Sequence, residues 1–219
     1  MASVTRRNRA RREDRRSEVR DRLLAAVERL LETGESYTEL SVERLTSEAG
    51  ISRSTFYVYF ADKGDLLRSW FEHLNEELQD PAARWWQLDG DSTKDDLRSA
   101  IRQILNTYRP HTKLMATVYD AASYDPDIGQ EVETTMSRNV AALRKHIKEG
   151  QREGWIAQDL RPDETAEWLM WMAERGQHRL IARADGDDDV ERLIDAYTDI
   201  VWHTLYAYAP SRLAAVAVG

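Results

Sequence analysis

Residues 51–60 of the chain read Ile-Ser-Arg-Ser-Thr-Phe-Tyr-Val-Tyr-Phe. The aromatic and β-branched composition of this stretch favours a strand by propensity alone. Ser52, however, stands where a helix N-cap belongs, and a helix would place Phe56 and Phe60 one turn apart on a single face. Because a helix separates the purely apolar side chains from the polar-tipped ones, and a lone strand would have no partner, we predict a helix here.

A second short helix is predicted directly before this one. Ser41 is a candidate N-cap for a helix that runs to Ala49, and Gly50 can adopt the positive φ that a tight turn often needs. The small side chain of Ala49 lets two helices approach at a steep angle, and Ile51 can anchor the turn in the core. This arrangement of two short helices around a tight turn predicts a helix-turn-helix.

Helical periodicity continues through nearly the whole chain. We expect a first helix at about residues 17–33, stopped by Gly34, and a longer helix from Lys63 to Leu78 that ends near Pro81. Gly186 and the acidic residues that follow it are expected to separate the last two helices. About nine helices, with no convincing strand pair, predict an all-α protein: a three-helix helix-turn-helix domain at residues 17–65 and a six-helix domain at residues 66–219.

Charge is distributed unevenly along a chain whose net charge is −8. Residues 1–16 contain seven arginines, and residues 1–65 hold 13 of the 31 basic but only 12 of the 39 acidic residues. Phosphate binding needs a local basic surface, not a basic protein. We interpret residues 1–16 as a basic arm, disordered in the free protein, that contacts DNA; the alternative is a solvated tail without a partner.

The predicted second helix of the motif carries polar side chains that suit DNA. The N-terminal end of a recognition helix meets base edges, and here it offers a guanidinium and two hydroxyls. Tyrosine hydroxyls and a lysine further along suit phosphate oxygens. An ordinary helical hairpin is the alternative, but no acidic residue occurs from Ser52 to Ala61 of this acidic chain. The candidate DNA-binding residues are Ser41, Arg44, Arg53, Ser54, Thr55, Tyr57, Tyr59 and Lys63.

Residues 50–63 as a whole closely resemble the signature of the TetR family of repressors. Residues 51–60 are most similar to those of the EthR-type regulators, and residues 173–175, Ala-Glu-Arg, lie where that subgroup has Asn-Glu-Arg. The resemblance implies nine helices, a dimer made mainly by the last two, and a small-molecule pocket in the C-terminal domain. It also implies that Arg53 and Ser54 set the operator sequence. The side chains that it implies face DNA are Thr55, Tyr57, Tyr59 and Lys63.

The C-terminal domain contains a helix that is apolar on every side, with Trp-Leu-Met-Trp-Met at residues 168–172. Such a helix must be covered all round, by core and by either a second subunit or a ligand. Aromatic and methionine side chains suit an adaptable apolar pocket, although equally they form simple core. Met170 and Ala173 stand where EthR-type proteins have asparagines, so we expect a greasier ligand. The candidate ligand-binding residues are Tyr108, Met115, Tyr119, Met136, Val140, Trp168, Trp171 and Met172.

A broad apolar face over residues 193–208 is interpreted as a dimer surface, with packing onto its own domain as the alternative. Two-fold pairing would space two recognition helices by roughly 34–36 Å, which is one turn of DNA. The predicted function is a repressor released from a palindromic operator by a small apolar effector. A constitutive DNA-binding regulator, or an activator without a ligand, is the alternative.

Other classes of protein find little support in the sequence. The chain has no cysteine, five scattered histidines without metal-ligand spacing, no glycine-rich phosphate loop and no nucleophile motif. A helical enzyme is therefore a distant alternative, and no catalytic site, metal or cofactor is expected. A charged N-terminus and the lack of an 18-residue apolar run predict a cytoplasmic protein with no membrane partner.

Overall fold

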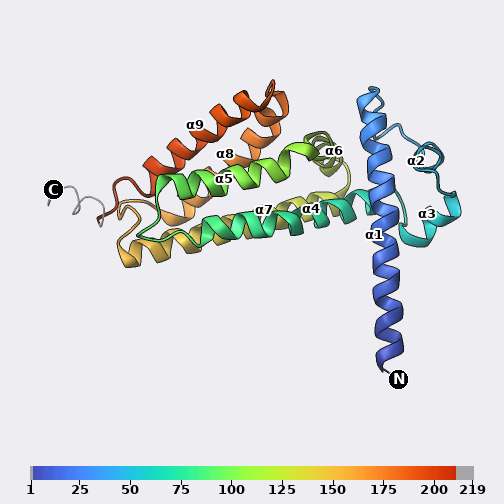
Figure 1. The fold of residues 1–219 in the computed structure, drawn as a ribbon, viewed down its shortest axis with the longest axis horizontal. Helices are drawn as coiled ribbons and strands as arrows, with labels where there is room; N and C mark the ends of the chain where they lie inside the picture. Colours follow the sequence, from blue (N-terminus) through green and yellow to red (C-terminus); the bar gives the residue numbers. More distant parts are fainter. Residues whose placement is uncertain (1, 211–219) are drawn as a thin grey trace. The chain divides into compact units, whose positions relative to one another are not determined.

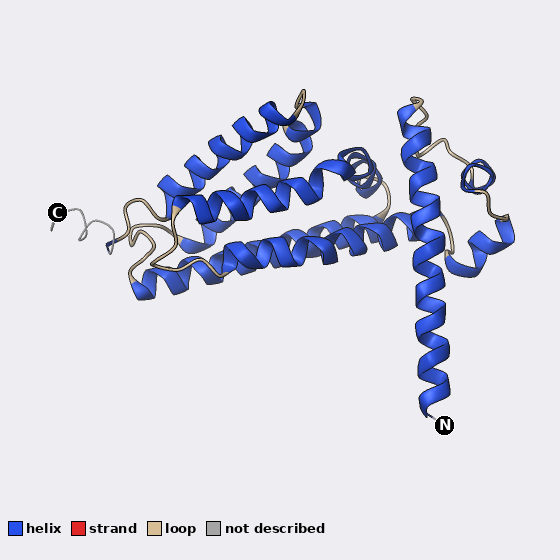
Figure 2. Ribbon diagram, in the orientation of Figure 1, coloured by secondary structure: helices blue, strands red, loops and turns tan. Residues whose placement is uncertain are grey.

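The computed structural model describes the backbone of residues 2–210 and the side chains from residue 15 to residue 210. Across that part of the chain every regular element is a helix, as Figure 2 shows. Nine α-helices are accompanied by two short 3-10 helices, Arg109–His111 and Ile181–Arg183. The predicted all-α class and the predicted number of helices are therefore confirmed.

The helices follow one another along the chain with the labels of Figure 1. Their bounds are α1 Ala2–Glu32, α2 Val42–Ala49, α3 Arg53–Tyr59, α4 Lys63–Trp86, α5 Lys94–Tyr108, α6 Thr112–Ala122, α7 Pro126–Glu153, α8 Pro162–Arg179 and α9 Asp187–Leu205. Prolines begin α7 and α8, where the missing N–H costs no hydrogen bond.

The first compact unit comprises the chain up to His73 together with residues 113–131. In it α1 packs against α2 and α3, as Figure 1 shows. The expectation that the first helix begins near residue 17 is wrong, because α1 begins at Ala2. Residues 2–16 contain no glycine or proline and are rich in arginine, which has a high helix propensity, so the helix continues through the expected arm.

Of the described residues, the second compact unit comprises 74–112 and 132–210. In this unit α4 passes Pro81 and ends only at Trp86, so the expected end of the helix near Pro81 is wrong. A proline inside a helix removes one hydrogen bond. Burial compensates for that loss: Trp85 is 2% exposed, and its Nε1 donates to the Tyr206 hydroxyl at 3.2 Å.

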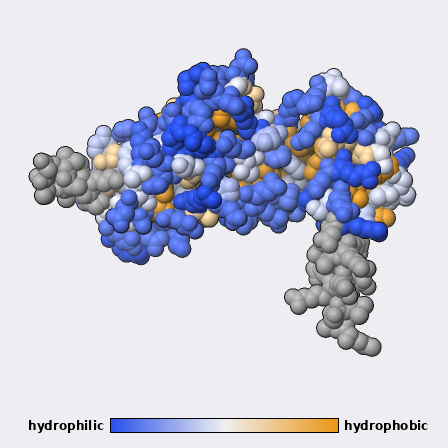
Figure 3. All heavy atoms as spheres, in the orientation of Figure 1, coloured by the Kyte–Doolittle hydropathy of each residue, from blue (hydrophilic) through white to orange (hydrophobic). Residues whose placement is uncertain are grey.

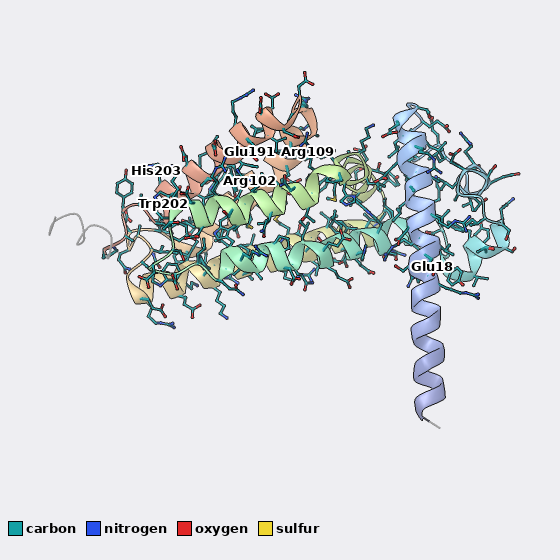
Figure 4. All side chains as sticks on the ribbon, viewed as in Figure 1. Glu18, Arg102, Arg109, Glu191, Trp202 and His203 are labelled. Carbon is teal, nitrogen blue, oxygen red and sulfur yellow. The ribbon has the colours of Figure 1, made fainter. Side chains whose placement is uncertain are left out.

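Ion pairs join α5 to α9 within this second unit. Arg98 pairs with Asp195 at 2.5 Å, and Arg102 pairs with Glu191 at 2.6 Å. Figure 4 shows the Arg102 and Glu191 side chains on the two facing helices. Lys94 pairs with Asp199 in the same way, and Arg109, in the 3-10 helix directly after α5, pairs with Asp187.

These acids recur every four residues, which places them on one face of α9. The acidic residues after Gly186 are therefore not the separator that the sequence predicts, because they form the first turn of α9. Pairs this exposed contribute little stability each, but their regular spacing fixes the register of α5 against α9.

The surface of the described residues is mainly hydrophilic on the side drawn in Figure 3, where apolar residues lie in small groups. Within the described part of the chain, no helix combines the length and the apolar character that crossing a membrane requires.

Candidate nucleic-acid interface

The two short helices of the motif both begin at serine caps. The Ser41 Oγ accepts a hydrogen bond from the Arg44 backbone N–H at 3.0 Å, and the Ser52 Oγ accepts one from the Thr55 N–H at 3.0 Å. Each bond satisfies one of the backbone donors that a helix start leaves free. The predicted caps of both helices are confirmed.

The turn between the helices depends on Gly50, whose φ of 64° lies in the left-handed region. Its N–H donates to the carbonyls of Ser47 and Thr46, so the turn closes the end of α2. Arg22 of α1 adds a second closure, because its guanidinium donates to the carbonyls of Ala49 and Gly50, both at 2.9 Å. The position of α3 therefore depends on α1 as well as on the turn.

The side of α3 that packs inward is made by Phe56 and by Phe60, the C-cap residue directly after the helix. Phe56 is 0% exposed and Phe60 1% exposed, with ring centroids 5.8 Å apart. Tyr57 is 51% exposed and meets Phe56 edge-on at 5.3 Å, which holds its ring while the side chain faces outward. The predicted helix and the predicted burial of both phenylalanines are confirmed.

The exposed start of α3 is a cluster of hydroxyls beside a guanidinium. The Ser52 Oγ lies 2.7 Å from the Ser54 Oγ and 2.8 Å from the Thr55 Oγ1. The Arg53 side chain is 59% exposed, with one carboxylate contact at 3.9 Å to Glu43. Arg53 is thus free to reorient toward a base edge, because a single exposed ion pair is weak.

Lys63 has a different setting from the one that the sequence predicts. Its Nζ donates to the carbonyls of Tyr37 at 2.9 Å, Thr38 at 3.1 Å and Leu40 at 2.5 Å. Burial lowers the pKa of Lys63. In return the Tyr37 hydroxyl donates to the Lys63 carbonyl at 2.7 Å, so the lysine ties α4 to the loop before α2. A phosphate contact from Lys63 stays a prediction, and it must compete with these three bonds.

Arg44 also carries internal contacts. Its guanidinium pairs with Glu35 at 3.1 Å and with Glu48 at 3.3 Å. Glu48 pairs in addition with Arg29 of α1 at 3.0 Å, and that hydrogen bond is the main reason why the pKa of Glu48 is lowered.

The sequence analysis did not predict a role for Arg22 and Arg29 of α1, which bond to the end of α2 and to the turn after it. They stand seven residues apart, which is two helical turns, so their shared face was a readable signal. Tyr37 was missed as well, and no local pattern points to it, because its partners lie 26 residues away in α4.

The eight candidate ligand-binding residues are divided between the two compact units. Met115 and Tyr119 group with the first compact unit, and the other six with the second. Within the second unit Tyr108 is buried and Met136 and Val140 are partly buried on its core, whereas three side chains are exposed. These are Trp168, Trp171 and Met172, with exposed fractions of 78%, 46% and 37%.

The exposure of these three side chains places them on the outside of α8 and not around an enclosed cavity. A surface hollow of about 340 Å³ lies elsewhere in the second unit, along α7, and is lined by Ala141, Arg144, Lys145, Lys148, Glu149 and Arg152. None of the candidate ligand-binding residues lines it. Among the described side chains, no three His, Cys, Asp or Glu groups gather as metal ligands.

Two family models match the chain. Residues 97–207 match the C-terminal domain of the transcriptional regulator EthR, and residues 23–69 match the bacterial regulatory proteins of the tetR family. The chain is 29% identical over 215 residues to the HTH-type transcriptional regulator EthR of Mycolicibacterium smegmatis. The matched residues cover 95% of this chain and 97% of that relative.

Solved structures with the same fold include the fatty acid degradation regulator FadR from Bacillus halodurans, with a TM-score of 0.67 at 17% identity, over 84% of this chain and 94% of that one. Another is a protein from Saccharomonospora viridis described as a transcriptional regulator, in complex with choline. Its TM-score is 0.67 at 20% identity, over 87% of this chain and 98% of that one.

Proposed function

Because the chain belongs to the TetR family of bacterial regulators and carries an EthR-type C-terminal domain, we propose that it is a dimeric repressor released from its operator by a small molecule. DNA binding and transcriptional regulation come with the family, which is not a family of enzymes. The observation that carries the proposal is α3, a capped helix with two buried phenylalanines and an outer face of hydroxyls and a guanidinium.

Operator contacts divide into two kinds on this face. Arg53 and Ser54 read base edges from the start of α3, and the Thr55, Tyr57 and Tyr59 hydroxyls hold phosphate oxygens. The start of α1, residues 2–16 with their seven arginines, is a basic arm that contacts DNA. A regulator of bacterial transcription acts where the chromosome is, so its place is the cytoplasm.

Dimerisation uses the outer faces of α8 and α9. Trp168, Trp171 and Met172 are exposed on α8, and Ile200 is 46% exposed on α9. Large apolar side chains that are exposed in this way are typical of an interface, because water is a poor environment for them. In this proposal the three α8 residues form part of the dimer surface and do not line the ligand site.

Release of the repressor from its operator follows from a shift of α4. This helix is continuous from Lys63 to Trp86 and contributes residues to both compact units. An effector in the C-terminal domain that binds the DNA-free arrangement of α4 better than the DNA-bound one lowers operator affinity. The structural neighbour in complex with choline supports a small-molecule effector for this fold.

A constitutive regulator without an effector is the second candidate function. The outward placement of Trp168 and Trp171 favours this second candidate, because neither side chain lines an interior pocket and ordinary core packing can fill the interior.

The test is a footprint on the DNA upstream of the protein's own gene, measured over a range of salt concentrations. We expect a palindromic protected region and an affinity that falls steeply with salt, because phosphate contacts release counterions. A protein that protects no region of this DNA would contradict the proposal that it binds an operator there. Loss of protection on adding an extract of small metabolites separates the ligand-responsive repressor from the constitutive regulator.

A further inference from the structure

Tyr108 is a buried phenol without a hydrogen-bond partner. It continues the inward face of α5, on which Ile101 and Leu105 are also buried, and only 3% of it is exposed. Its hydroxyl has no hydrogen-bond partner among the described residues. A buried hydroxyl in this state costs free energy, so each such group calls for an explanation.

Glu174 is a buried carboxylate that also has an oxygen without a hydrogen-bond partner among the described residues. Ala166, Met170 and Glu174 recur every four residues and form the inward face of α8, so the carboxylate stands at an otherwise apolar position. Glu174 is 8% exposed, and its Oε2 accepts no hydrogen bond from any described residue. Arg175 forms an ion pair with it, but its Nε lies 3.9 Å from the Oε2, beyond hydrogen-bond distance, and its side chain is 62% exposed.

Both groups belong to the second compact unit, and both are buried. The pKa of Tyr108 is raised, first by burial and then by the negative charge of Glu174, so the charge reaches the phenol. Yet no hydrogen bond joins them. A carboxylate is costly to bury unless a cation or hydrogen-bond donors compensate it, and the Oε2 of Glu174 has no hydrogen-bond donor among the described residues and a long ion pair, at 3.9 Å, to the exposed Arg175.

We propose that Glu174 and Tyr108 form the polar anchor of the effector site and that the effector is an amphipathic cation, an ammonium or a similar donor on an apolar body. An ammonium only donates hydrogen bonds, so it can satisfy both the carboxylate and the phenol oxygen. The apolar part of the molecule then packs on the Met170 and Leu105 side of the same helices. This inference rests on the proposed ligand response, and it replaces a wholly apolar effector by a charged one.

The test uses three ligands with one alkyl chain and different heads: octylamine hydrochloride, 1-octanol and sodium octanoate. Isothermal titration calorimetry of the full chain at pH 7 should show octylamine binding at least about tenfold more tightly than either other compound, because only its head pairs with a carboxylate. Glu174→Gln should reduce octylamine affinity to that of octanol, and Tyr108→Phe should reduce it a few-fold.

Glu167→Gln, the same substitution at an exposed position of α8, is the matched control and should leave octylamine binding unchanged. Equal affinities of the three ligands for the unaltered protein, or unchanged octylamine binding by Glu174→Gln, would overturn the inference. If Glu174→Gln does not fold, the three-ligand series on the unaltered chain still decides.

Operator release by the same ligands, read by fluorescence anisotropy, tests the proposed function separately. Octylamine that binds through Glu174 without releasing DNA would contradict the ligand-responsive repressor and leave the anchor intact. Release by octanol as effective as release by octylamine would support the repressor and overturn the anchor.

Discussion

His146 is a titratable side chain held inside the second compact unit, where it is 4% exposed. Its Nε2 lies 2.8 Å from the Tyr206 hydroxyl, and its ring also bonds to the backbone of Trp86. Tyr206 in turn accepts a hydrogen bond from Trp85 Nε1. Both ring nitrogens are therefore used by the neutral imidazole, which ties α7 to the end of α4 and to the turn after α9.

Acid should destabilise the protein through this histidine. Burial lowers the pKa of His146 from 6.5 to about 4, so the folded protein takes up this proton at lower pH than the unfolded chain. The contribution of the neutral His146 to the free energy of unfolding is fully present above pH 6.5 and is lost as the pH falls from 6.5 toward 4. At about 1.36 kcal/mol per pKa unit it amounts to roughly 3 kcal/mol. Urea unfolding at several pH values between 7.5 and 4.5 measures it.

Carboxylates also titrate in part of this range, so the comparison is between variants. His146→Gln should flatten the decline of the unfolding free energy between pH 6.5 and 4.5, whereas His203→Gln, at an exposed position, should not. An identical decline in His146→Gln and the unaltered protein would show that the buried ring is not the cause.

Single residues differ in how far the sequence predicts their setting. The Ser52 cap and the burial of Phe56 follow from spacing within one helix, and both predictions are confirmed. The capture of Lys63 by three loop carbonyls depends on contacts more than 20 residues away in sequence, which local patterns do not contain. Trp168 reads as apolar in either setting, so periodicity could not distinguish a pocket from a surface.

Among the elements, α3 is the shortest α-helix and depends most on its ends. It has seven residues, and isolated helices of that length are not stable in water. Its stability therefore comes from the Ser52 cap and from the two phenylalanines that pack inward.

Ser52→Ala should lower the unfolding free energy by about 1 kcal/mol, because the cap hydrogen bond is lost. Ser52→Asp should keep the stability, since aspartate also caps, but should weaken operator binding because it adds a negative charge near phosphate. Chemical denaturation and fluorescence anisotropy on the two variants measure these effects. Equal operator affinity for Ser52→Asp and the unaltered protein would place the start of α3 away from DNA.

Longer elements show where a local sequence signal fails to predict the structure. Pro81 predicts a helix end, yet the buried Trp85 holds α4 for another turn, so tertiary packing outweighs the proline. At the start of the chain the error has the opposite origin. The arginine run suggests disorder by charge, whereas the helix propensity of arginine and the absence of breakers favour the continuous α1.

For the whole molecule, the exposed apolar side chains on the outer faces of α8 and α9 lead to a prediction about the oligomeric state. Trp168→Glu should convert the proposed dimer to a monomer, because it places a charge within the proposed apolar interface. Light scattering after size exclusion measures this change. Operator affinity should fall by about a hundredfold or more, since two linked half-sites bind more tightly than one.

Tyr124→Glu is the matched control, because Tyr124 is a comparably exposed aromatic residue outside α8 and α9. It should remain a dimer. A Trp168→Glu protein with unchanged mass in solution would move the dimer surface away from α8.

The most direct test of α3 as the reading helix compares Arg53→Ala with Tyr57→Phe on the operator and on a set of single-base variants of it, at several salt concentrations. Tyr57→Phe should weaken binding by a similar factor on every sequence, and Arg53→Ala should lose about 1–3 kcal/mol of discrimination at particular base pairs. If both substitutions reduced binding equally on all sequences, or neither reduced it, the outer face of α3 would not be the surface that reads the operator.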